Sequence, residues 1–277
     1  MRGILRTVPA PTAETLAEVL RPLTDEPGRA AVFCDIDGTL APIVRRADDA
    51  KVDERASRQL AVIARRYGCA ACISGRSATE ARRLVGVGGI AYAGTHGAEL
   101  LLPSAARPVL DPQVAGWADR VRAFAREHDT RELRTLRIRI EDKGPIVAFH
   151  WRGAPDEDVA RAKVEQIAAA AEEAGLWVHW GRKVLEVRPP VEINKGRAIR
   201  ELVSRFPSRA AMFAGDDATD LDAFDALEEL LSEGALEAAV LVGIASDEGP
   251  QAIVERADLV VDGVAGFRAV LGTLAAV

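Results

Sequence analysis

Two aspartates separated by one residue come directly after a short apolar segment and could perform covalent chemistry. Asp35 and Asp37 follow residues 30–34, a continuous apolar run typical of a strand buried on both faces. A carboxylate at the end of such a strand can attack phosphorus and form an aspartyl-phosphate. A carboxylate two residues later can donate a proton to the leaving oxygen and then accept one from water. The spacing predicts a phosphohydrolase with Asp35 as nucleophile and Asp37 as general acid and base.

A second pair of carboxylates, Asp216 and Asp217, follows another apolar run at residues 210–214. Ligands of open α/β sheets bind at the carboxyl ends of the strands, so the two acidic pairs are expected to meet there. Carboxylates gathered in one place repel one another unless a cation lies between them. Hard oxygen ligands with some water suit Mg²⁺, which favours phosphate chemistry. We therefore expect Mg²⁺ as the cofactor.

Further residues offer groups that can hold a phosphate. Gly38 permits a tight turn, and Thr39 supplies a hydroxyl and a backbone N–H for phosphate oxygens. Ser74-Gly75-Arg76 follows the next apolar run and begins a helix. A hydroxyl, a flexible turn and a helix N-terminus together form a candidate anion site. Lys195 begins another helix after Asn194 and could neutralise the phosphoryl group during the reaction.

Each of these motifs also occurs for structural reasons alone. Asp-x-Asp is commonly a solvated loop, Ser-Gly is a frequent loop dipeptide, and Asp216-Asp217 could cap a helix N-terminus. Cys69 and Cys72 lie in an apolar run, which is typical of core thiols rather than of a redox or zinc pair. The chemical interpretation is favoured for the acidic motifs because they follow apolar runs or begin helices, in one consistent order.

The motifs are positioned by strands that alternate with helices over most of the chain. This alternation is typical of right-handed βαβ units and a parallel sheet. The predicted strands are residues 30–34, 69–73, 90–93, 210–214, 239–242 and 259–261. The predicted helices are residues 12–23, 53–67, 77–85, 195–206 and 220–231, with a last helix from Val264.

The alternation is interrupted after residue 102, where Pro103, Pro108 and Pro112 mark a boundary. Beyond it we predict helices at 114–127 and 156–174, and strands at 133–140, 145–151, 177–180 and 184–188. Leu136, Ile138 and Ile140 alternate with Arg137, Arg139 and Glu141, which is typical of a strand with one solvated face. The prediction is an α/β fold with an N-terminal helical extension (1–27), a parallel-sheet core (28–103 and 191–277) and an inserted α/β domain (104–190) that carries a small antiparallel sheet.

Composition argues against several classes of protein. The 277 residues have a formal net charge of -6 and a pI of about 5.4, whereas a sequence-independent nucleic-acid binder is usually basic. The three cysteines fit a reducing compartment. No apolar run approaches the ~20 residues of a membrane span, and residues 1–5 lack the apolar core of a signal peptide. We expect a cytoplasmic monomer that acts on a small molecule, with neither nucleic acid nor a membrane as partner.

The order of the motifs resembles the haloacid dehalogenase superfamily of phosphatases. This resemblance is carried by Asp35-Ile36-Asp37-Gly38-Thr39, Ser74-Gly75-Arg76, Lys195-Gly196 and Gly215-Asp216-Asp217. More narrowly, the chain is similar to the trehalose-6-phosphate phosphatases. The narrower similarity is carried by residues 93–99 (AGTHGAE), 147–152 (VAFHWR), 181–189 (GRKVLEVRP) and 215–220 (GDDATD).

The resemblance implies a Rossmann-like core with a mobile α/β cap, and hydrolysis of trehalose 6-phosphate to trehalose and phosphate. The catalytic residues that it implies are Asp35, Asp37 and Lys195. The implied phosphate-binding residues are Gly38, Thr39, Ser74, Gly75 and Arg76. The implied Mg²⁺ ligands are Asp35, the carbonyl of Asp37, Asp216 and Asp217, with Asp220 close by. The implied substrate contacts are His96, Glu99, Arg182, Lys183, Glu186 and Asn194.

Other functions stay open at this point. Another sugar-phosphate phosphatase of the same superfamily would differ only in its substrate contacts. A phosphotransferase would use the same nucleophile but pass the phosphoryl group to a sugar rather than to water. A protein from a different class, a non-catalytic phosphatase-like partner of a synthase, is disfavoured by the intact set of Asp35, Asp37, Lys195 and Asp216.

Several candidate residues have an alternative structural role. His96 lies in a glycine turn and could be structural or contact the substrate. Glu186 alternates with apolar residues, so it could face bulk solvent or a cleft. Leu221 stands where the family usually has Glu, and Arg182 where it often has Lys, which changes the donor geometry. The tryptophans of the insert are expected in its core, with a sugar-stacking platform as the alternative; they are Trp117, Trp151, Trp177 and Trp180.

Overall fold

The chain folds into two compact units, which are described separately. The computed structural model describes residues 10–44, 46, 49–246 and 249–277. Unit 1 contains the described residues up to Val109 and from Ile193 onwards, and unit 2 contains residues 110–192. The predicted domain bounds at 27/28, 103/104 and 190/191 remain predictions. Residues 1–9 of the predicted N-terminal extension lie outside the described residues.

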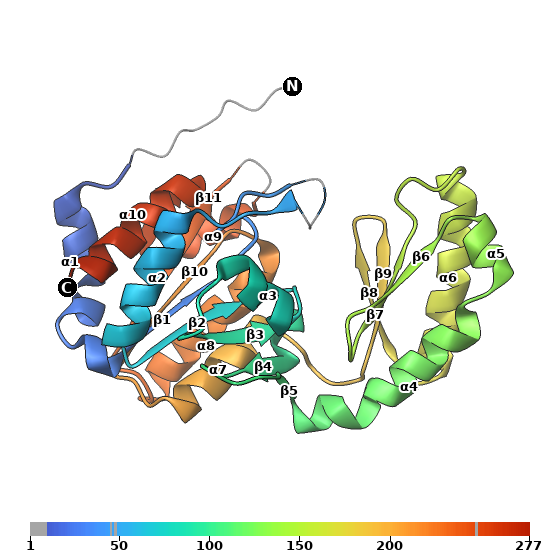
Figure 1. Ribbon diagram of the computed structural model, residues 1–277, viewed down its shortest axis with the longest axis horizontal. Helices are drawn as coiled ribbons and strands as arrows, with labels where there is room; N and C mark the ends of the chain where they lie inside the picture. Colours follow the sequence, from blue (N-terminus) through green and yellow to red (C-terminus); the bar gives the residue numbers. More distant parts are fainter. Residues whose placement is uncertain (1–9, 45, 47–48, 247–248) are drawn as a thin grey trace. The chain divides into compact units, whose positions relative to one another are not determined.

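Unit 1 is built on one eight-stranded sheet (Figure 1) in the order β12-β11-β10-β1-β2-β3-β4-β5. Neighbouring strands from β12 to β3 run parallel, and β4 runs antiparallel to β3. The strands are β1 (Ala30–Cys34), β2 (Cys69–Ile73), β3 (Ala91–Gly94), β4 (Glu99–Leu101), β5 (Val109–Leu110), β10 (Ala210–Gly215), β11 (Ala238–Ala245) and β12 (Leu259–Asp262). The predicted α/β class with a parallel sheet is confirmed.

Helices cover both faces of this sheet. Ala30, Val32 and Cys34 of β1 pack with α1, α2, α3 and α10, whereas Ala31 and Phe33 pack with α7, α8 and α9. Burial on both sides explains why β1 is apolar along its whole length. The helices of unit 1 are α1 (Ala13–Thr24), α2 (Glu54–Arg66), α3 (Ala78–Val85), α7 (Lys195–Arg205), α8 (Leu221–Ser232), α9 (Gln251–Arg256) and α10 (Gly263–Ala276). Among the described residues, no helix is both long enough and apolar enough to cross a membrane.

Side-chain caps fix where several of these helices begin. The side chains of Thr12, Asp53, Ser77 and Asn194 accept hydrogen bonds from the free backbone N–H groups of α1, α2, α3 and α7. Such caps satisfy donors that have no partner within the helix. The predicted helices at 12–23, 53–67 and 77–85 start one residue early because they include the capping residue.

The shortest elements were not predicted. β4, β5 and α9 contain 3, 2 and 6 residues, too few for a periodic pattern to be distinguished. Short 3₁₀ turns are η1 (Pro27–Arg29), η3 (Thr95–Gly97) and η4 (Ala218–Asp220). η3 is the most consequential of them for the site, because it reverses the chain between β3 and β4.

Unit 2 is a four-stranded antiparallel sheet in the order β6-β7-β9-β8, with helices on one face. Phe149, Leu185 and Val187 point from the sheet into a core shared with α4 and α6. Its elements are α4 (Pro112–His128), α5 (Arg131–Thr135), β6 (Arg139–Asp142), β7 (Val147–His150), α6 (Glu157–Glu173), β8 (Trp177–Gly181) and β9 (Val184–Arg188). The predicted small antiparallel sheet with helices on one face is confirmed.

The predicted strand at 133–140 is wrong over residues 133–138. α5 occupies the start of this segment, and β6 begins only at Arg139. Thr130 caps α5, because its hydroxyl oxygen accepts a hydrogen bond from the Leu133 N–H at 3.4 Å. Arg137 then adopts a positive φ of 55° between helix and strand. The alternating pattern begins only at Leu136, so it does not support a strand over residues 133–135, where the Thr130 cap starts a helix.

The three cysteines are buried and free, as predicted for core thiols. Cys69 packs into the core on one face of the sheet, and Cys72 packs into the core on the other. Burial raises the pKa of the Cys69 thiol to about 12, so it stays protonated at neutral pH. The Cys-x-x-Cys spacing thus results from the alternation of a buried strand, and its two thiols point in different directions.

Candidate active site

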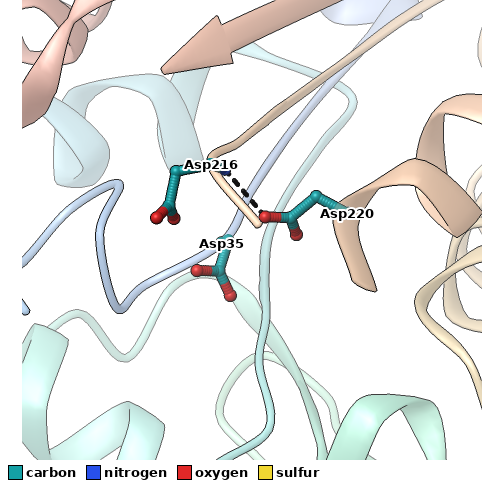
Figure 2. Close-up of side chains that lie close together, drawn as sticks. All are labelled: Asp35, Asp216 and Asp220. Atoms are coloured by element: carbon teal, nitrogen blue, oxygen red, sulfur yellow. Dashed lines mark hydrogen bonds between the residues drawn. The ribbon is translucent and has the colours of Figure 1, made fainter. Parts of the chain in front are cut away.

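Three buried carboxylates lie together at the carboxyl ends of two neighbouring strands. Asp35 follows β1, Asp216 follows β10, and Asp220 ends η4. One carboxylate oxygen from each residue lies within 4.8 Å of those of the other two, and Figure 2 shows the three side chains together. β1 and β10 are parallel neighbours, and the Asp35 N–H continues their ladder to the Ala214 carbonyl at 2.8 Å. The pairing of these two strands therefore brings together acidic residues that are 181 positions apart, the difference between 216 and 35.

Lys195 is the cation that offsets this buried negative charge. Its Nζ donates to Asp35 Oδ1 at 2.8 Å and to Asp220 Oδ1 at 2.6 Å, and its side chain is 2% exposed. Burial alone would lower the pKa of Lys195, but the two carboxylates raise it above its usual value. Burial also raises the pKa of Asp35, and Lys195 opposes that rise. The lysine is thus held charged between two acidic partners.

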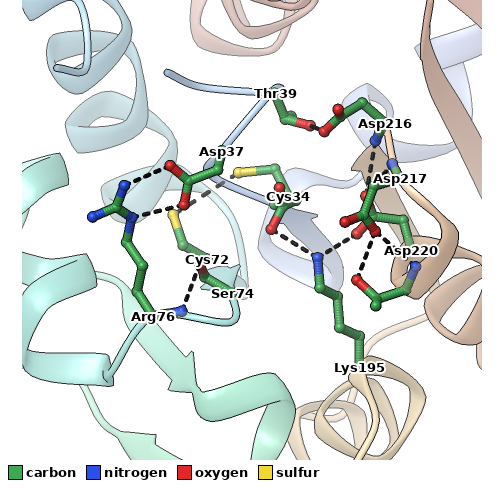
Figure 3. Close-up of polar contacts among 12 residues, drawn as sticks. Cys34, Asp37, Thr39, Cys72, Ser74, Arg76, Lys195, Asp216, Asp217 and Asp220 are labelled. Carbon is green, nitrogen blue, oxygen red and sulfur yellow. Dashed lines mark hydrogen bonds and ion pairs between the residues drawn. The ribbon is translucent and has the colours of Figure 1, made fainter. Parts of the chain in front are cut away.

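The acidic residues after β10 have different partners (Figure 3). Asp220 accepts hydrogen bonds from the backbone N–H groups of Asp216 and Asp217, at 2.8 and 3.0 Å. The Asp217 side chain points into its own turn, where it accepts from the N–H and the hydroxyl of Thr219, both at 2.7 Å. Asp220 therefore fixes the turn and the lysine, while the carboxylate of Asp217 caps η4.

Asp216 is the carboxylate of this group that is least compensated by donors. It accepts a hydrogen bond from the Thr39 hydroxyl at 3.3 Å, and it is 2% exposed. Burial, followed by repulsion from Asp220 and Asp217, raises the pKa of Asp216 to about 7. An added cation would relieve this repulsion, and carboxylate oxygens are ligands that hard divalent cations prefer. The donor set formed by Asp35 and Asp216 therefore fits a divalent metal.

The turn after Asp35 brings the backbone against the acidic cluster. Gly38 has a φ of +98°, and a Cβ at this position would lie 2.1 Å from Asp216 Oδ2. Glycine is thus required twice, for its left-handed conformation and for the close approach of its backbone. Thr39 comes next in the turn and is fully buried. The turn residues singled out from the sequence therefore lie against Asp216.

Asp37 is held by the loop that follows β2. Arg76 donates from Nε to Asp37 Oδ2 at 2.7 Å and from Nη2 to Asp37 Oδ1 at 2.6 Å (Figure 3). Such two-point pairs between a guanidinium and a carboxylate fix geometry as well as charge. Ser74, which is 1% exposed, accepts a hydrogen bond from the Arg76 N–H at 3.2 Å. The candidate general acid and the Ser74-Gly75-Arg76 motif are therefore neighbours.

A strained turn supports the loop that carries Arg76. Thr95 and His96 of η3 have φ values of 51° and 58°, which are unusual for residues other than glycine. Their N–H groups donate to the carbonyls of Arg76 and Ser74, at 2.8 and 2.9 Å. A Cβ at Gly75 would lie 2.8 Å from the His96 ring, so the ring packs closely on the loop. This packing supports a structural role for His96, and a substrate contact remains a prediction.

The other two predicted contacts of unit 1 occupy helix N-termini. Glu99 accepts a hydrogen bond from the Ala78 N–H at 2.6 Å, at the start of α3. Burial raises the pKa of Glu99, and this hydrogen bond opposes the rise. Asn194 caps α7 by accepting from the Arg197 N–H at 2.8 Å. Both residues thus have structural bonds, and a role in substrate binding remains a prediction for each.

The remaining predicted contacts, Arg182, Lys183 and Glu186, belong to unit 2. Arg182 and Lys183 form the turn between β8 and β9, where Lys183 has a φ of 62°. Lys183 Nζ donates to Glu157 Oε2 at 2.5 Å. Glu186 is only 7% exposed, so its predicted alternative of facing bulk solvent is wrong. Arg182 and Lys183 therefore lie in a turn at the end of the sheet, and Glu186 lies in the strand β9.

Glu186 lies in a charged cluster that the sequence analysis missed. Lys143 Nζ donates to Glu186 Oε1 at 3.0 Å, and Arg188 donates to Glu186 Oε2. Burial would raise the pKa of Glu186, but the charges of Lys143 and Arg188 outweigh burial and lower this pKa to about 2. Glu141 and His150 form a second pair nearby in the sheet, joined at 2.7 Å. The place of this cluster on one side of the sheet could have been predicted from the sequence, because charged residues alternate with the apolar core positions of β6 and β9.

The cluster belongs to one surface, the polar face, which is the side of the unit 2 sheet opposite α4 and α6. Residues paired across antiparallel strands project from the same side, and Leu185 and Val187 point into the core. The other positions therefore form the polar face, together with Lys143 at the end of β6. Its residues are Arg139, Glu141, Lys143, Ala148, His150, Trp177, His179, Gly181, Val184, Glu186 and Arg188.

The tryptophans divide between the core and the surface of unit 2. Trp151 is buried at 6%, and Trp117 packs against the same core, as predicted. Trp177 and Trp180 are 52% and 44% exposed, so the core prediction is wrong for these two. Trp177 pairs with Arg188 across β8 and β9 and lies on the polar face. An exposed aromatic ring beside charged groups keeps the predicted alternative, a sugar-stacking platform, open for Trp177.

Comparison with known proteins assigns this arrangement to a family. The model of the trehalose-phosphatase family matches residues 33–253. The chain belongs to the trehalose-phosphatase family. A trehalose-phosphate phosphatase from Mycobacterium marinum is 36% identical over 218 residues, which are 72% of this chain and 52% of that protein. The chain therefore spans about half the length of the trehalose-phosphate phosphatases that it matches.

This member of the trehalose-phosphatase family is also similar in fold to solved structures. A crystal structure of a trehalose-6-phosphate phosphatase related protein superposes with a TM-score of 0.68 and 26% identity, over 89% of this chain and 97% of that one. The C-terminal domain of Candida albicans trehalose-6-phosphate phosphatase has a TM-score of 0.71 and 21% identity, over 94% and 97% of the two chains. The second similarity shows the fold alone. The resemblance found in the sequence motifs is confirmed.

Proposed function

We propose that this protein hydrolyses trehalose 6-phosphate to trehalose and phosphate through an aspartyl-phosphate on Asp35. The observation that carries the proposal is the buried arrangement of Asp35, Lys195 and Asp216 at the carboxyl ends of β1 and β10. A nucleophilic carboxylate needs a nearby positive charge to approach an anionic phosphate, and Lys195 provides one. The family match supports the reaction class, and the names of the most similar relatives support the substrate.

The residues of unit 1 have complementary roles in this proposal. Asp35 attacks phosphorus, and Asp37 in its protonated form donates that proton to the sugar oxygen as the phosphorus–oxygen bond breaks. Water then attacks phosphorus, Asp37 accepts a proton from that water, and the bond between phosphorus and the Asp35 oxygen breaks, which releases phosphate and restores the Asp35 carboxylate. Lys195 offsets the charge on the phosphoryl oxygens in both steps, while Thr39 and Ser74 offer hydroxyl groups to them.

We also propose Mg²⁺ as the metal, with Asp35 and Asp216 as carboxylate ligands and with the Asp37 carbonyl and Asp217 as further candidates. Asp35 and Asp216 are buried close together, and a hard cation would relieve their repulsion. When bound, the cation supplies positive charge that lowers the barrier to attack on an anionic phosphate. Asp220 is a weaker candidate, because its oxygens already accept from Lys195 and from two backbone N–H groups.

Sugar recognition is proposed for the polar face of unit 2. Glu186 and Glu141 can accept hydrogen bonds from sugar hydroxyls, while Lys143, Arg188 and His150 can donate to them. A disaccharide has many hydroxyls, and a surface with fixed donors and acceptors discriminates against substrates that leave those groups unpaired. Glu186 is held rigidly by two cations, which supports a role in selecting the substrate.

A panel of sugar phosphates tests the proposed function. Phosphate release is measured from trehalose 6-phosphate, glucose 6-phosphate, sucrose 6-phosphate and p-nitrophenyl phosphate, each with Mg²⁺ and with a chelator. We expect kcat/KM for trehalose 6-phosphate to exceed that of the other sugar phosphates by about tenfold or more, and the chelator to abolish release. Preference for another sugar would replace the substrate, and release from none of them would contradict the proposal altogether.

Glu186→Gln should impair recognition of the sugar while sparing phosphate chemistry. Gln keeps the shape but loses the charge that strengthens hydrogen bonds to hydroxyls, so KM for trehalose 6-phosphate should rise about tenfold. The KM for p-nitrophenyl phosphate, which has no sugar, should stay within about twofold. Glu165→Gln on α6 is a matched control, because Glu165 is exposed and its ion pair with Arg161 lies within the same helix. An equal loss on both substrates would instead indicate damage to unit 2.

A further inference from the structure

Arg76 contacts both carboxylate oxygens of Asp37, through its Nε and its Nη2. The two donor–acceptor distances, 2.7 and 2.6 Å, are those of strong charge-assisted hydrogen bonds (Figure 3). The Arg76 side chain is 16% exposed, and that of Asp37 is 37% exposed. The guanidinium is therefore the more buried partner, and it reaches outward to a carboxylate that solvent can still approach.

The backbone that carries Arg76 is fixed from both sides. Its N–H donates to the Ser74 hydroxyl at 3.2 Å, and its carbonyl accepts from the Thr95 N–H at 2.8 Å. Ser74 is in turn bonded through its own N–H to the Ala93 carbonyl of β3 at 2.9 Å. Because β2 and β3 are paired strands, these bonds anchor the loop that carries Arg76 to the end of the sheet.

Asp37, by contrast, lies in a turn whose next residue is Gly38. A carboxylate two bonds from the backbone in such a turn has several rotamers available, and a positive-φ glycine beside it adds no side-chain packing. Proton transfer in a transition state needs the donor oxygen within about 3 Å of the leaving oxygen. The rotamer of Asp37 must therefore be set by something outside its own turn.

We propose that Arg76 is the residue that positions Asp37 for protonation of the leaving sugar oxygen. The inference rests on the proposed function, because it assigns Asp37 as the general acid. It assigns Arg76 a role different from direct binding of the substrate phosphate, which the sequence motif alone suggested. Arg76 is a positioning residue: it acts on the reaction through the orientation of Asp37.

The dependence of the reaction on the leaving group separates the two roles. A sugar alkoxide is a poor leaving group and needs a proton, whereas p-nitrophenolate departs without one. The value of kcat/KM reports steps up to the first irreversible one, which is loss of the leaving group, so it isolates the acid role of Asp37. A residue that binds phosphate would affect both kinds of substrate equally.

Arg76→Ala and Asp37→Asn are compared on trehalose 6-phosphate and p-nitrophenyl phosphate. For both variants we expect kcat/KM to fall about 100-fold or more on the sugar phosphate and only a few-fold on the aryl phosphate. Arg76→Lys should be intermediate, because Lys keeps the charge but cannot form the two-point pair. In the double variant Arg76→Ala/Asp37→Asn, the loss should not exceed that of Asp37→Asn alone, because both changes remove one function.

Arg82→Ala is the matched control. Arg82 is also an arginine next to the sheet, on α3, and donates to the Ala105 carbonyl at 2.7 Å. Arg82→Ala should leave kcat/KM unchanged for both substrates. Thermal unfolding would show whether any of the arginine variants loses its fold. If Arg76→Ala does not fold, Arg76→Lys still distinguishes the two roles, because its losses in kcat/KM on trehalose 6-phosphate and on p-nitrophenyl phosphate can be compared.

Two results would overturn the inference. Equal losses on the sugar and aryl phosphates would show that Arg76 binds phosphate, and additive losses in the double variant would show that it acts apart from Asp37. Failure of the proposed function is seen separately, in the wild-type protein. If wild type releases phosphate from p-nitrophenyl phosphate and a different sugar phosphate, that sugar phosphate takes the place of trehalose 6-phosphate in the comparison.

Discussion

Asp35→Asn is expected to lower kcat by about 10⁵-fold on every phosphate monoester, because an amide cannot attack phosphorus to form the acyl-phosphate. The effect should be the same for sugar and aryl phosphates, since both pass through the same covalent step. The fold should survive the substitution. Asn has the shape of Asp, and Lys195 keeps its second carboxylate partner, Asp220, at 2.6 Å.

The covalent intermediate offers a more direct measurement than turnover. Wild-type protein mixed with p-nitrophenyl phosphate and quenched in acid should carry a phosphoryl group on the peptide that contains Asp35, as mass spectrometry would detect. Asp35→Asn should carry none, while Asp37→Asn should still become phosphorylated, because its nucleophile is intact. Turnover by Asp35→Asn near the wild-type rate, or phosphorylation on another residue, would refute Asp35 as nucleophile.

Asp35 was predictable from the sequence because its position depends on a strand whose sequence is unambiguous. β1 and β2 have the same bounds as the apolar runs from which they were predicted, and each run is followed by a polar residue that has a role in the proposed reaction. Parallel strands buried on both faces leave their carboxyl ends as the place where polar groups can gather. Local patterns and this topological rule together were enough to bring Asp35 and Asp216 to one edge of the sheet.

The partners of these residues could not be predicted in the same way. The contact between Arg76 and Asp37 depends on rotamers across a loop and a turn, which no periodic pattern encodes. The cluster around Glu186 depends on the register of β6, β7 and β9, which is set by pairing between segments far apart in the sequence. The helix α5 begins at a side-chain cap from Thr130, just before the alternating pattern at residues 136–141. In each case the missing information was a specific contact rather than a propensity.

Lys195→Met is expected to cost both activity and stability. The substitution leaves Asp35 and Asp220 buried, at 4% and 0% exposure, without their cation. Removing one partner of a buried ion pair costs about 3–5 kcal/mol of the free energy of unfolding. The kcat should fall about 10³-fold, because the phosphoryl charge loses its fixed counter-charge. The free energy of unfolding is measured by denaturant unfolding in the presence of a chelator. The kcat is measured with Mg²⁺.

The loss of stability in Lys195→Met should depend on pH. In wild type Lys195 opposes the rise that burial causes in the pKa of Asp35. Without the lysine, the folded-state pKa values of the two carboxyls rise further above their unfolded values. Such groups contribute stability below the unfolded pKa and lose it as pH rises through the folded pKa. The destabilisation of Lys195→Met should therefore be largest at high pH and diminish on acidification.

A second substitution distinguishes lost charge balance from lost packing. In Lys195→Met/Asp220→Asn one buried carboxylate becomes neutral, and the Asn oxygen can still accept from the N–H groups of Asp216 and Asp217. The double variant should be more stable than Lys195→Met at neutral pH and equally inactive, because the phosphoryl group still lacks its cation. If the double variant gains no stability, the cost of Lys195→Met lies in packing. If it regains activity, Lys195 serves only to neutralise Asp220.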